Sequence, residues 1–301
     1  MRVSTQSVVK NLVANLERSY ERMTRFQREL STGTRINNPS DDPSGTQRSL
    51  ALRVDIRENE QFRRNIREAK GWLNMTETSL AHVEEVLLSV QSLASQGAST
   101  LISPTERQIL ADSVDQAAER VLDLSRTTLN GKFIFGGTDT TNDPFIVTRN
   151  TDGRIVSIQI SPTAAGSVER EITDGVRIQI NTPPDAVFGG TLNPLNSLIE
   201  LRNRLVNSDV EGVGAVAGEL ETVRRQVTDV RGSVGSKTSR IDMTENVLSR
   251  LITDLQSVLS ETEDVNIAEH VMNLRQEENV YQAALMTASN ILPPTLEQFL
   301  R

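Results

Sequence analysis

Only a few residues in this chain have the types that catalysis or metal binding requires. Its two histidines, His82 and His270, stand far apart in the sequence, and neither lies within a metal-ligand motif. Each is explained more simply as a histidine on the surface of a helix. The chain contains no cysteine, which excludes disulfides and thiolate-bound metals. The histidines therefore give no support for a catalytic centre or a metal site.

Two other short motifs have the composition of ligand-binding loops. The run Ser40-Asp41-Asp42 carries oxygen donors that suit Ca²⁺ or Mg²⁺, but it lacks the alternating ligands and the distal Glu of a calcium loop. Helix capping and turn formation explain it better. Gly136-Gly137 lacks the spacing and the lysine of a phosphate-binding loop. We therefore expect that the protein is not an enzyme and that it holds no cofactor and no metal.

The composition predicts thin helical cores rather than one thick globular core. Of the 301 residues, 37% are hydrophobic but only 3% are aromatic, so Leu, Val and Ile must supply most of the packing. The net charge is −8 and no Lys/Arg-rich run occurs, which makes nucleic acid and anionic membranes poor candidates as partners. No stretch approaches the ~20 apolar residues of a membrane-spanning helix, and the first residues lack a signal-peptide core. We expect a protein that is cytosolic or is exported without a cleaved signal peptide.

Proline and glycine divide the chain into helical and irregular parts. No proline lies between Ser44 and Ser103 or between Leu195 and Leu292, whereas Gly131–Gly190 holds eight of the 17 glycines and four of the ten prolines. Proline breaks helices and glycine weakens them. The distribution therefore predicts long helices on both sides of an irregular or β-rich insert.

Both ends of the chain are predicted to be amphipathic helices. The first runs from about Thr5 to Ser31 and the last from about Asn266 to Ile291, and apolar residues recur in each at steps of three and four. Gly33 is placed to end the first helix in a left-handed turn. The residues that we expect to form an assembly seam, between helices or between subunits, are Leu12, Leu16, Met23, Phe26, Leu30, Leu274, Tyr281, Leu285, Leu292 and Leu300.

A polar loop follows the first helix. Its residues Pro39, Ser40, Asp41, Asp42 and Pro43 are of the types that favour turns. Ser40 or Asp42 is expected to cap the next helix, with Pro43 at its first position.

That second helix is predicted over about 43–98. The third opens with the capping box of residues 103–106, Ser-Pro-Thr-Glu, and is expected to end at Asn130-Gly131. The clearest helical signal is a heptad seam from Val213 to Val258, about six repeats long, which Lys237 and Thr244 interrupt.

The insert between these helices changes to a period of two. Phe133 and Phe135 alternate with other residues, as do the apolar residues of 155–160 and of 176–180. Turn signals precede the last two runs, at Thr151-Asp152-Gly153 and at Asp174-Gly175. The pattern predicts short strands in a β-rich domain of about 60 residues, with helices resuming near Pro194.

The two ends of the chain carry opposite charge. Residues 1–37 hold seven Arg/Lys against three Glu, whereas residues 260–301 hold two Arg against seven acidic residues. Helices of opposite charge attract each other, so this split favours side-by-side pairing of the first and last helices.

Three sequence stretches resemble the flagellin superfamily. The first is Met1–Gln6 together with Gly33–Pro43; the second is Asn130–Thr138; the third runs from Tyr281 to Leu300. The Pro-Ser-Asp-Asp-Pro form of the loop is more similar to the hook–filament junction branch of the superfamily, the hook-associated proteins, than to filament flagellins, which usually carry a small residue where Pro43 stands. The resemblance covers about four-fifths of the chain and leaves out the insert.

The resemblance implies a mainly α fold. It is a long antiparallel helical bundle or coiled coil built from both chain ends, with a small β-rich inserted domain. Residues 1–45 and 266–301 would form a terminal coiled-coil inner-tube domain, and residues 46–130 and 194–265 a helical rod domain. Residues 131–193 would form a β-rich domain on the outside.

The resemblance also implies a function. A structural protein of this kind forms the junction between the hook and the flagellin filament by self-assembly of its terminal helices. It would be secreted unfolded to the extracellular bacterial flagellum through the type III export channel, with a cytosolic chaperone on its C-terminal helix. Its partners would be its own copies in a ring, another hook-associated protein on the hook side and flagellin on the filament side.

The residues themselves support assembly without this resemblance. Isolated helices are marginal in water and depend on packing, so we expect the two ends to be loosely ordered until subunits pack together. Two other functions stay open. One is a filament flagellin, and the other, from a different class, is a cytosolic coiled-coil scaffold.

Overall fold

The computed structural model describes residues 2–190 and 192–291. It divides into two compact units. Unit 1 comprises Met1–Glu58 and Leu251–Arg301, and unit 2 comprises Asn59–Arg250. The predicted seam residues Leu292 and Leu300 lie outside the described residues.

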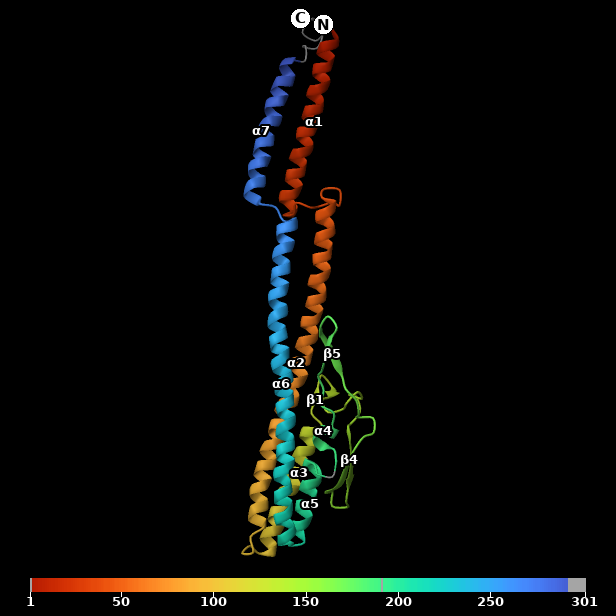
Figure 1. Ribbon diagram of the computed structural model, residues 1–301, viewed down its shortest axis with the longest axis vertical. Coiled ribbons are helices and arrows are strands. Elements are labelled where there is room, and N and C mark those ends of the chain that lie inside the picture. The colour runs from red at the N-terminus through yellow and green to blue at the C-terminus, as the bar shows by residue number, and fades with distance from the viewer. Residues whose placement is uncertain (1, 191, 292–301) are drawn as a thin grey trace. The chain divides into compact units, whose positions relative to one another are not determined.

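Unit 1 brings the two ends of the described chain together. Helix α1 (Arg2–Thr32) lies alongside helix α7 (Ile267–Ile291) (Figure 1). The helices are antiparallel, because Glu29 near the end of α1 contacts His270 near the start of α7, while Arg22 contacts Glu277 further along. The predicted pairing of oppositely charged terminal helices is confirmed.

Two long helices, α2 (Pro43–Gly97) and α6 (Val210–Glu263), contribute to both units. In unit 2 each carries a seam of side chains that are at most 4% exposed. On α2 these are Ile66, Ala69, Leu73, Leu80, Val83, Leu87, Val90 and Ala94, and on α6 they are Val213, Val216, Leu220, Val223, Val227, Val234, Ile241 and Leu248. The heptad prediction is therefore confirmed up to Leu248.

Beyond Leu248 the predicted seam is wrong at two positions, whereas Leu255 is partly buried. Leu251 and Val258 were expected to continue it, but they are 41% and 43% exposed, and Ile252 is buried in their place. The next buried residue after Leu248 is thus four positions later, at Ile252, whereas the heptad pattern predicts three positions. A straight helix with 3.6 residues per turn drifts relative to a 3.5-residue repeat, so one additional residue restores the inward direction.

Polar side chains beside the seam set the register of α2 against α6 in unit 2. They recur every seven residues on α2. Because the two helices are antiparallel, the residue numbers of their partners on α6 decrease along the series. The pairs include Lys70–Asp242 at 2.7 Å, Glu77–Arg231 at 2.6 Å, Glu84–Arg224 at 3.4 Å and Gln91–Glu221 at 3.3 Å. Burial alone would raise the pKa of Glu84, but hydrogen bonds from Arg231 and Thr228 outweigh it and hold the pKa below its usual value.

Helices α3 (Pro104–Ser125) and α5 (Pro194–Val206) complete the helical part of unit 2 (Figure 1). The first residue of each helix is a proline, and the residue before that proline caps the helix. Ser103 caps α3, and its hydroxyl accepts the N–H of Glu106 at 3.2 Å while Glu106 accepts the N–H of Ser103 at 2.6 Å. Asn193 caps α5 in the same position. The predicted capping box and the return to helix at Pro194 are confirmed.

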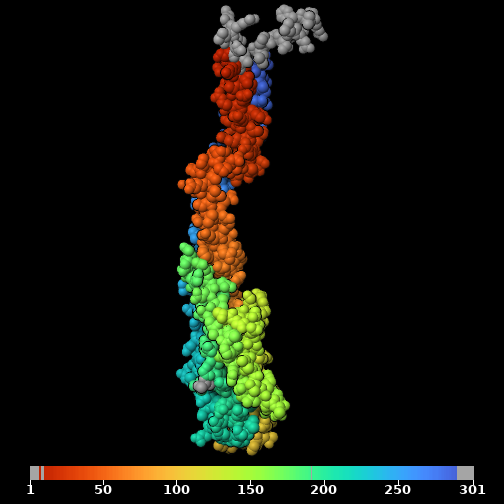
Figure 2. All heavy atoms as spheres, turned by 90° about the vertical axis from the view of Figure 1, so that its right-hand side faces the viewer, coloured from red at the N-terminus to blue at the C-terminus, as the bar shows by residue number. Residues whose placement is uncertain are grey.

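The insert consists of short antiparallel hairpins. The strands are β1 (Thr128–Leu129), β2 (Lys132–Phe133), β3 (Phe145–Arg149), β4 (Ile155–Ile160), β5 (Glu169–Thr173) and β6 (Val176–Gln179), paired β1–β2, β3–β4 and β5–β6. A one-turn helix, α4 (Asp185–Phe188), follows them. Phe188 packs edge-on against Phe135 and Phe145, with ring centroids 5.5 and 5.3 Å apart. In the space-filling view the insert lies on the near face of unit 2 (Figure 2).

The predicted end of the third helix is wrong. The helix was expected to run to Asn130-Gly131 but stops at Ser125. Asn130 and Gly131 have φ of 53° and 75°, and they form the two-residue turn between β1 and β2. Two successive positive φ values define the tight hairpin turn that Asn-Gly prefers, so this pair connects strands instead of ending a helix.

Candidate assembly surfaces

The described residues offer several surfaces for association. Among residues 2–190 and 192–291, no group of three or more His, Cys, Asp or Glu side chains is arranged to hold a metal ion. A search of the same residues finds no helix with the length and apolar character to span a membrane.

The predicted seam of α1 lies against α7 in unit 1 but is only partly covered. Leu12, Leu16, Met23, Phe26 and Leu30 are all of intermediate exposure. On α7 the predicted residues Leu274 and Tyr281 are also partly buried, whereas Leu285 is 45% exposed. A two-helix pair cannot enclose an apolar strip on all sides, so much of this surface stays in contact with solvent.

Polar contacts fasten the middle of α1 to α7. The guanidinium of Arg22 donates to Glu277 Oε1 at 2.8 Å, and the hydroxyl of Ser19 donates to Glu277 Oε2 at 2.9 Å. Ser19 is 2% exposed, so the pair is covered on that side. The hydrogen bond from Arg22 lowers the pKa of Glu277 and raises that of Arg22.

His270 makes a contact that sequence reasoning missed. Its Nε2 lies 3.1 Å from Glu29 Oε2, and its Nδ1 lies 3.2 Å from the carbonyl oxygen of Asn266. Phe26 packs edge-on against the imidazole at 5.7 Å between ring centroids. The prediction of a histidine on the helix surface is wrong here, because the side chain of His270 is only 15% exposed. The only signal in the sequence was that a histidine lies in one terminal helix and a glutamate in the other.

The loop after α1 is tied to the end of α6. Gly33 adopts φ of 74° and its N–H bonds to Glu29 O at 2.9 Å, which ends α1 as predicted. A single antiparallel bridge then joins Thr34 to Asp264. The backbone N–H of Arg35 donates to Glu263 O at 2.6 Å. The loop is therefore held by backbone hydrogen bonds to a segment more than 200 positions away in the sequence.

Arg35 and Arg53 strengthen this connection with side-chain bonds. Arg35 donates to the carbonyl oxygen of Thr262 at 2.8 Å, and Arg53 of α2 donates to Glu263 Oε1 at 2.7 Å. Glu263 is 9% exposed. Sequence reasoning missed Glu263, because its partners come from distant parts of the chain.

The two aspartates of the predicted loop act on the backbone. Asp42 Oδ1 accepts the N–H of Gly45 at 2.9 Å and so caps α2. This confirms Asp42 among the two predicted caps. The same hydrogen bond lowers the pKa of Asp42. Asp41 Oδ2 accepts the N–H of Asn38 at 2.8 Å. The other predicted cap, Ser40, is exposed, as are Pro39 and Pro43.

Gly45 is the residue that lets this loop fold onto the start of α2. A Cβ atom at position 45 would lie 2.5 Å from Asp42 Oδ2 and 2.6 Å from Ile36 Cδ1. Both distances are shorter than real Cβ contacts, so any larger residue would displace the cap or Ile36.

Unit 1 also exposes a second set of large apolar residues, which we call the outer apolar set. It comprises Val13 and Tyr20 of α1 and Ile267, Met272, Val280, Leu285 and Met286 of α7. Their exposed fractions run from 45% for Leu285 to 69% for Met286. Scattered exposed apolar residues are normal, but seven on two paired helices are a candidate contact surface.

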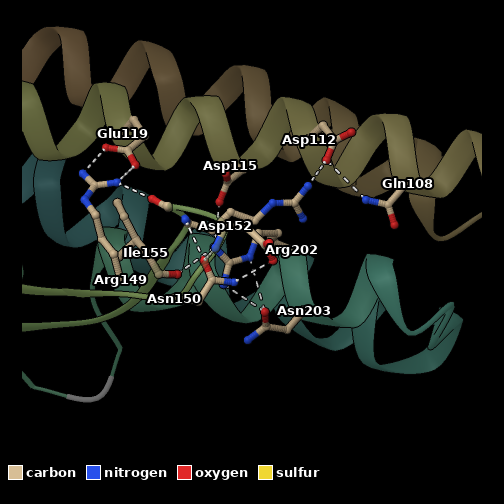
Figure 3. Close-up of polar contacts among 12 residues, drawn as sticks. Gln108, Asp112, Asp115, Glu119, Arg149, Asn150, Asp152, Ile155, Arg202 and Asn203 are labelled. Carbon is tan, nitrogen blue, oxygen red and sulfur yellow. Dashed lines mark hydrogen bonds and ion pairs between the residues drawn. The ribbon is translucent and has the colours of Figure 1, made fainter.

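In unit 2, a row of arginine–carboxylate pairs fastens the insert and α5 to α3. The carboxylates are Asp112, Asp115 and Glu119, which lie on one face of α3 because they are three and four residues apart (Figure 3). Their partners are Arg154 at 2.8 Å, Arg202 at 2.6 Å and Arg149, whose Nη2 donates to Glu119 Oε2 at 2.8 Å. The row adds polar contacts to the apolar packing of the insert on the helices, in which Phe135 and Ile155 are fully buried.

Arg202 is the buried member of this row. Its side chain is 8% exposed, and its Nη1 donates both to Asp115 Oδ1 and, at 2.7 Å, to the carbonyl oxygen of Ile155 in β4 (Figure 3). One guanidinium thus joins α5, α3 and the β3–β4 hairpin. The Arg154–Asp112 pair is more exposed, with side chains 35% and 49% exposed.

We expect Arg202→Ala to destabilise unit 2 by about 3–5 kcal/mol, because it leaves the mostly buried Asp115 carboxylate and the Ile155 carbonyl without their donor. Arg154→Ala in the same row provides the matched control and should cost about 0–1 kcal/mol, as expected for a solvent-exposed pair. Urea unfolding followed by circular dichroism measures both. Equal losses for the two variants would contradict the assigned difference in burial.

We expect the α1–α7 pairing to weaken in acid. The pKa of Glu277 is lowered in the folded state, so its contribution is fully present above the unfolded-state pKa near 4.5. That contribution is lost as the pH falls through the lower folded-state value. Amide hydrogen exchange in α1 between pH 3 and pH 6, on the parent and on Glu277→Gln, measures this. Glu278→Gln, one position away, is the control. An unchanged pH dependence in Glu277→Gln would refute the assignment.

Comparison with known proteins places these features in a family. The model of the bacterial flagellin N-terminal helical region matches residues 3–140, and that of the C-terminal helical region matches residues 218–292, together more than half of the chain. Flagellar hook-associated protein 3 of Escherichia coli (strain K12) is 27% identical over 146 residues, which are 48% of this chain and 46% of that protein. The chain therefore matches less than half of the length of this relative. The flagellar filament 30.7 kDa core protein of Treponema maltophilum is 22% identical over 273 residues, 88% of this chain and 89% of that protein.

Solved structures share the fold. A putative flagellar hook-associated protein from Vibrio parahaemolyticus superimposes with a TM-score of 0.65 at 19% identity, over 74% of this chain and 100% of that chain. Bacillus cereus FlgL superimposes with a TM-score of 0.57 at 22% identity, over 70% of this chain and 99% of that chain. With both flagellin helical regions matched and the mainly α fold with a β-containing insert present, this chain belongs to the bacterial flagellin family.

Proposed function

We propose that this chain is a structural protein of the bacterial flagellum that forms the junction between hook and filament. The observation that carries the proposal is the match of the chain to hook-associated protein 3 of Escherichia coli and of Salmonella typhimurium, at 27% and 26% identity. The loop from Pro39 to Pro43 supports it, since a proline at position 43 resembles the hook-associated branch. In this structure Pro43 opens α2 directly after the Asp42 cap.

The chain assembles through unit 1. The predicted seam residues of α1 and α7 are only partly covered by their own pairing, and the outer apolar set is exposed. A fully buried Leu, Met or Phe side chain contributes about 1.5–3 kcal/mol, and much of this is unrealised in one copy. Neighbouring copies in a ring, another hook-associated protein on one side and flagellin on the other are the partners that would bury these residues.

The protein reaches that place by export to the outside of the cell. As the resemblance implies, it travels unfolded through the flagellar type III channel without a cleaved signal peptide, and a cytosolic chaperone holds its C-terminal helix. The absence of cysteine suits this route, because no disulfide can form before passage. The three domains inferred from the sequence belong to the same proposal, with residues 131–193 outermost.

Filament flagellin is the second candidate, and one observation favours it. Several flagellins and filament core proteins match most of the chain, as in the case of Treponema maltophilum at 88%, whereas the hook-associated proteins 3 match about half of it. A cytosolic coiled-coil scaffold, the remaining alternative, would be found only inside cells.

A deletion strain tests the proposal. We expect cells without this protein to build hooks, to lack filaments and to shed unpolymerised flagellin into the medium, because the filament has no attachment point. Electron microscopy of the cells and immunoblotting of the medium measure both effects. Intact filaments on the deletion strain would refute a junction role. Filaments absent together with no shed flagellin, and long polymers formed by the purified protein, would favour the filament alternative.

The outer apolar set can be tested in the complemented strain. Leu285→Asp places a charge at a residue that is 45% exposed, so we expect folding and export to continue while filament attachment falls at least about tenfold. Gln282→Asp adds the same charge to an exposed polar position of α7 and should behave like the parent. Attachment is scored as filaments per hook. Equal attachment in both strains would exclude Leu285 from the contact surface.

A further inference from the structure

A cavity in unit 2 has no role in the contacts described above. It measures about 320 Å³ and lies where α2 meets the β1–β2 and β5–β6 hairpins. Its lining includes Arg67 and Trp72 of α2, Lys132 of β2 and Arg170 of β5. A space of this size accommodates a small organic group.

The cavity carries an excess of positive charge. Arg170 is paired with Glu68, whose Oε2 lies 3.6 Å from its Nε. Neither Arg67 nor Lys132 has an ion-pair partner within residues 2–190 and 192–291. The tight Asn130-Gly131 turn fixes the backbone of Lys132 opposite Leu129 in the hairpin register, and the exposed side chain of Lys132 is one of those that line the cavity. The lining therefore favours an anion.

Trp72, which lines the cavity, carries an unused hydrogen-bond donor. The side chain is 9% exposed, and its indole Nε1–H has no acceptor among the residues that the structure describes. An indole N–H can only donate, and buried donors are nearly always paired. An oxygen acceptor from outside this chain would satisfy it.

Apart from Asn130, the remaining lining residues of the cavity are apolar or lack a side chain. Ile180 is 2% exposed and Leu129 is partly buried. Gly71 adds no side chain, and a Cβ atom there would touch only Leu129 Cδ2, at 4.0 Å. The lining thus contains both cations and hydrocarbon, which suits an anionic head on a short apolar stem.

We propose that this cavity binds a carboxylate carried on a short hydrocarbon chain. Arg67 and Lys132 attract the charge, the indole N–H of Trp72 donates to a carboxylate oxygen, and Leu129 and Ile180 contact the hydrocarbon. The carboxylate belongs either to a small free organic acid or to a glutamate side chain of a second copy, since the chemistry is the same.

The only tryptophan of the chain lines this cavity, so its fluorescence reports on occupancy directly. We expect butyrate to shift Trp72 emission in a saturable way below about 100 mM, the range that binding of so small a ligand requires. Sodium chloride and butylammonium chloride at equal ionic strength should give no saturable change. A linear response to butyrate, or the same response to sodium chloride, would overturn the proposal.

Two variants separate binding in the cavity from general attraction of anions. Arg67→Gln combined with Lys132→Gln should weaken butyrate about tenfold, because two attractive charges are lost. Gly71→Leu leaves every charge in place but fills the space, and it should abolish the saturable change. Arg64→Gln is the control, since Arg64 is exposed on α2 and hydrogen-bonds to Gln61. Undiminished butyrate binding by Gly71→Leu, with native circular dichroism, would overturn the proposal.

A last measurement identifies the source of the carboxylate. If a second copy supplies it, Trp72 emission should change with protein concentration in parallel with the sedimentation coefficient, and butyrate should reverse the change. If a free acid supplies it, emission should be independent of protein concentration while butyrate still binds. Both results support the cavity as a carboxylate site and assign its occupant.

Discussion

Every long helix in this protein depends on an apolar strip that is only a few side chains wide. The aromatic content of 3% excludes a thick core, so stability comes from Leu, Val and Ile side chains that meet along paired helices. Such a strip is buried between α2 and α6 in unit 2, where Leu80 of α2 and Val227 of α6 are fully enclosed. In unit 1 the strip of α1 and α7 is left partly open. This difference between a closed and an open strip is the reason why the proposed association surface lies in unit 1 and not in unit 2.

The sequence predicted the helices well, because their signals are local. Heptad spacing, the Ser103 capping box and the Gly33 stop are each readable within a few residues, and the structure confirms them. Asn130-Gly131 was misread, since the same dipeptide is compatible with a helix end and with a hairpin turn. Only the pairing of β1 with β2, which involves tertiary contacts, distinguishes the two.

The contacts that hold the candidate surfaces together could not be predicted from local patterns. Glu263 contacts Arg53, which is 210 residues away in the sequence, and His270 contacts Glu29, which is also more than 200 residues away in the sequence. Charge totals predicted that the terminal helices pair, but totals do not identify which charges meet. The acidic face of α3 was readable as a three-four spacing, yet nothing local indicated that Arg202 would be its buried partner.

Lys237 illustrates how specificity is added to a uniform seam. It occupies a seam position of α6 between Val234 and Ile241, and burial lowers its pKa from the usual value. A charged residue among apolar ones costs stability, so it is poorly explained as packing. A repeating strip of Val and Leu fits equally well when shifted by seven residues, whereas a single polar position makes the shifted pairings unequal. A charge at this seam position therefore favours one register of α2 against α6.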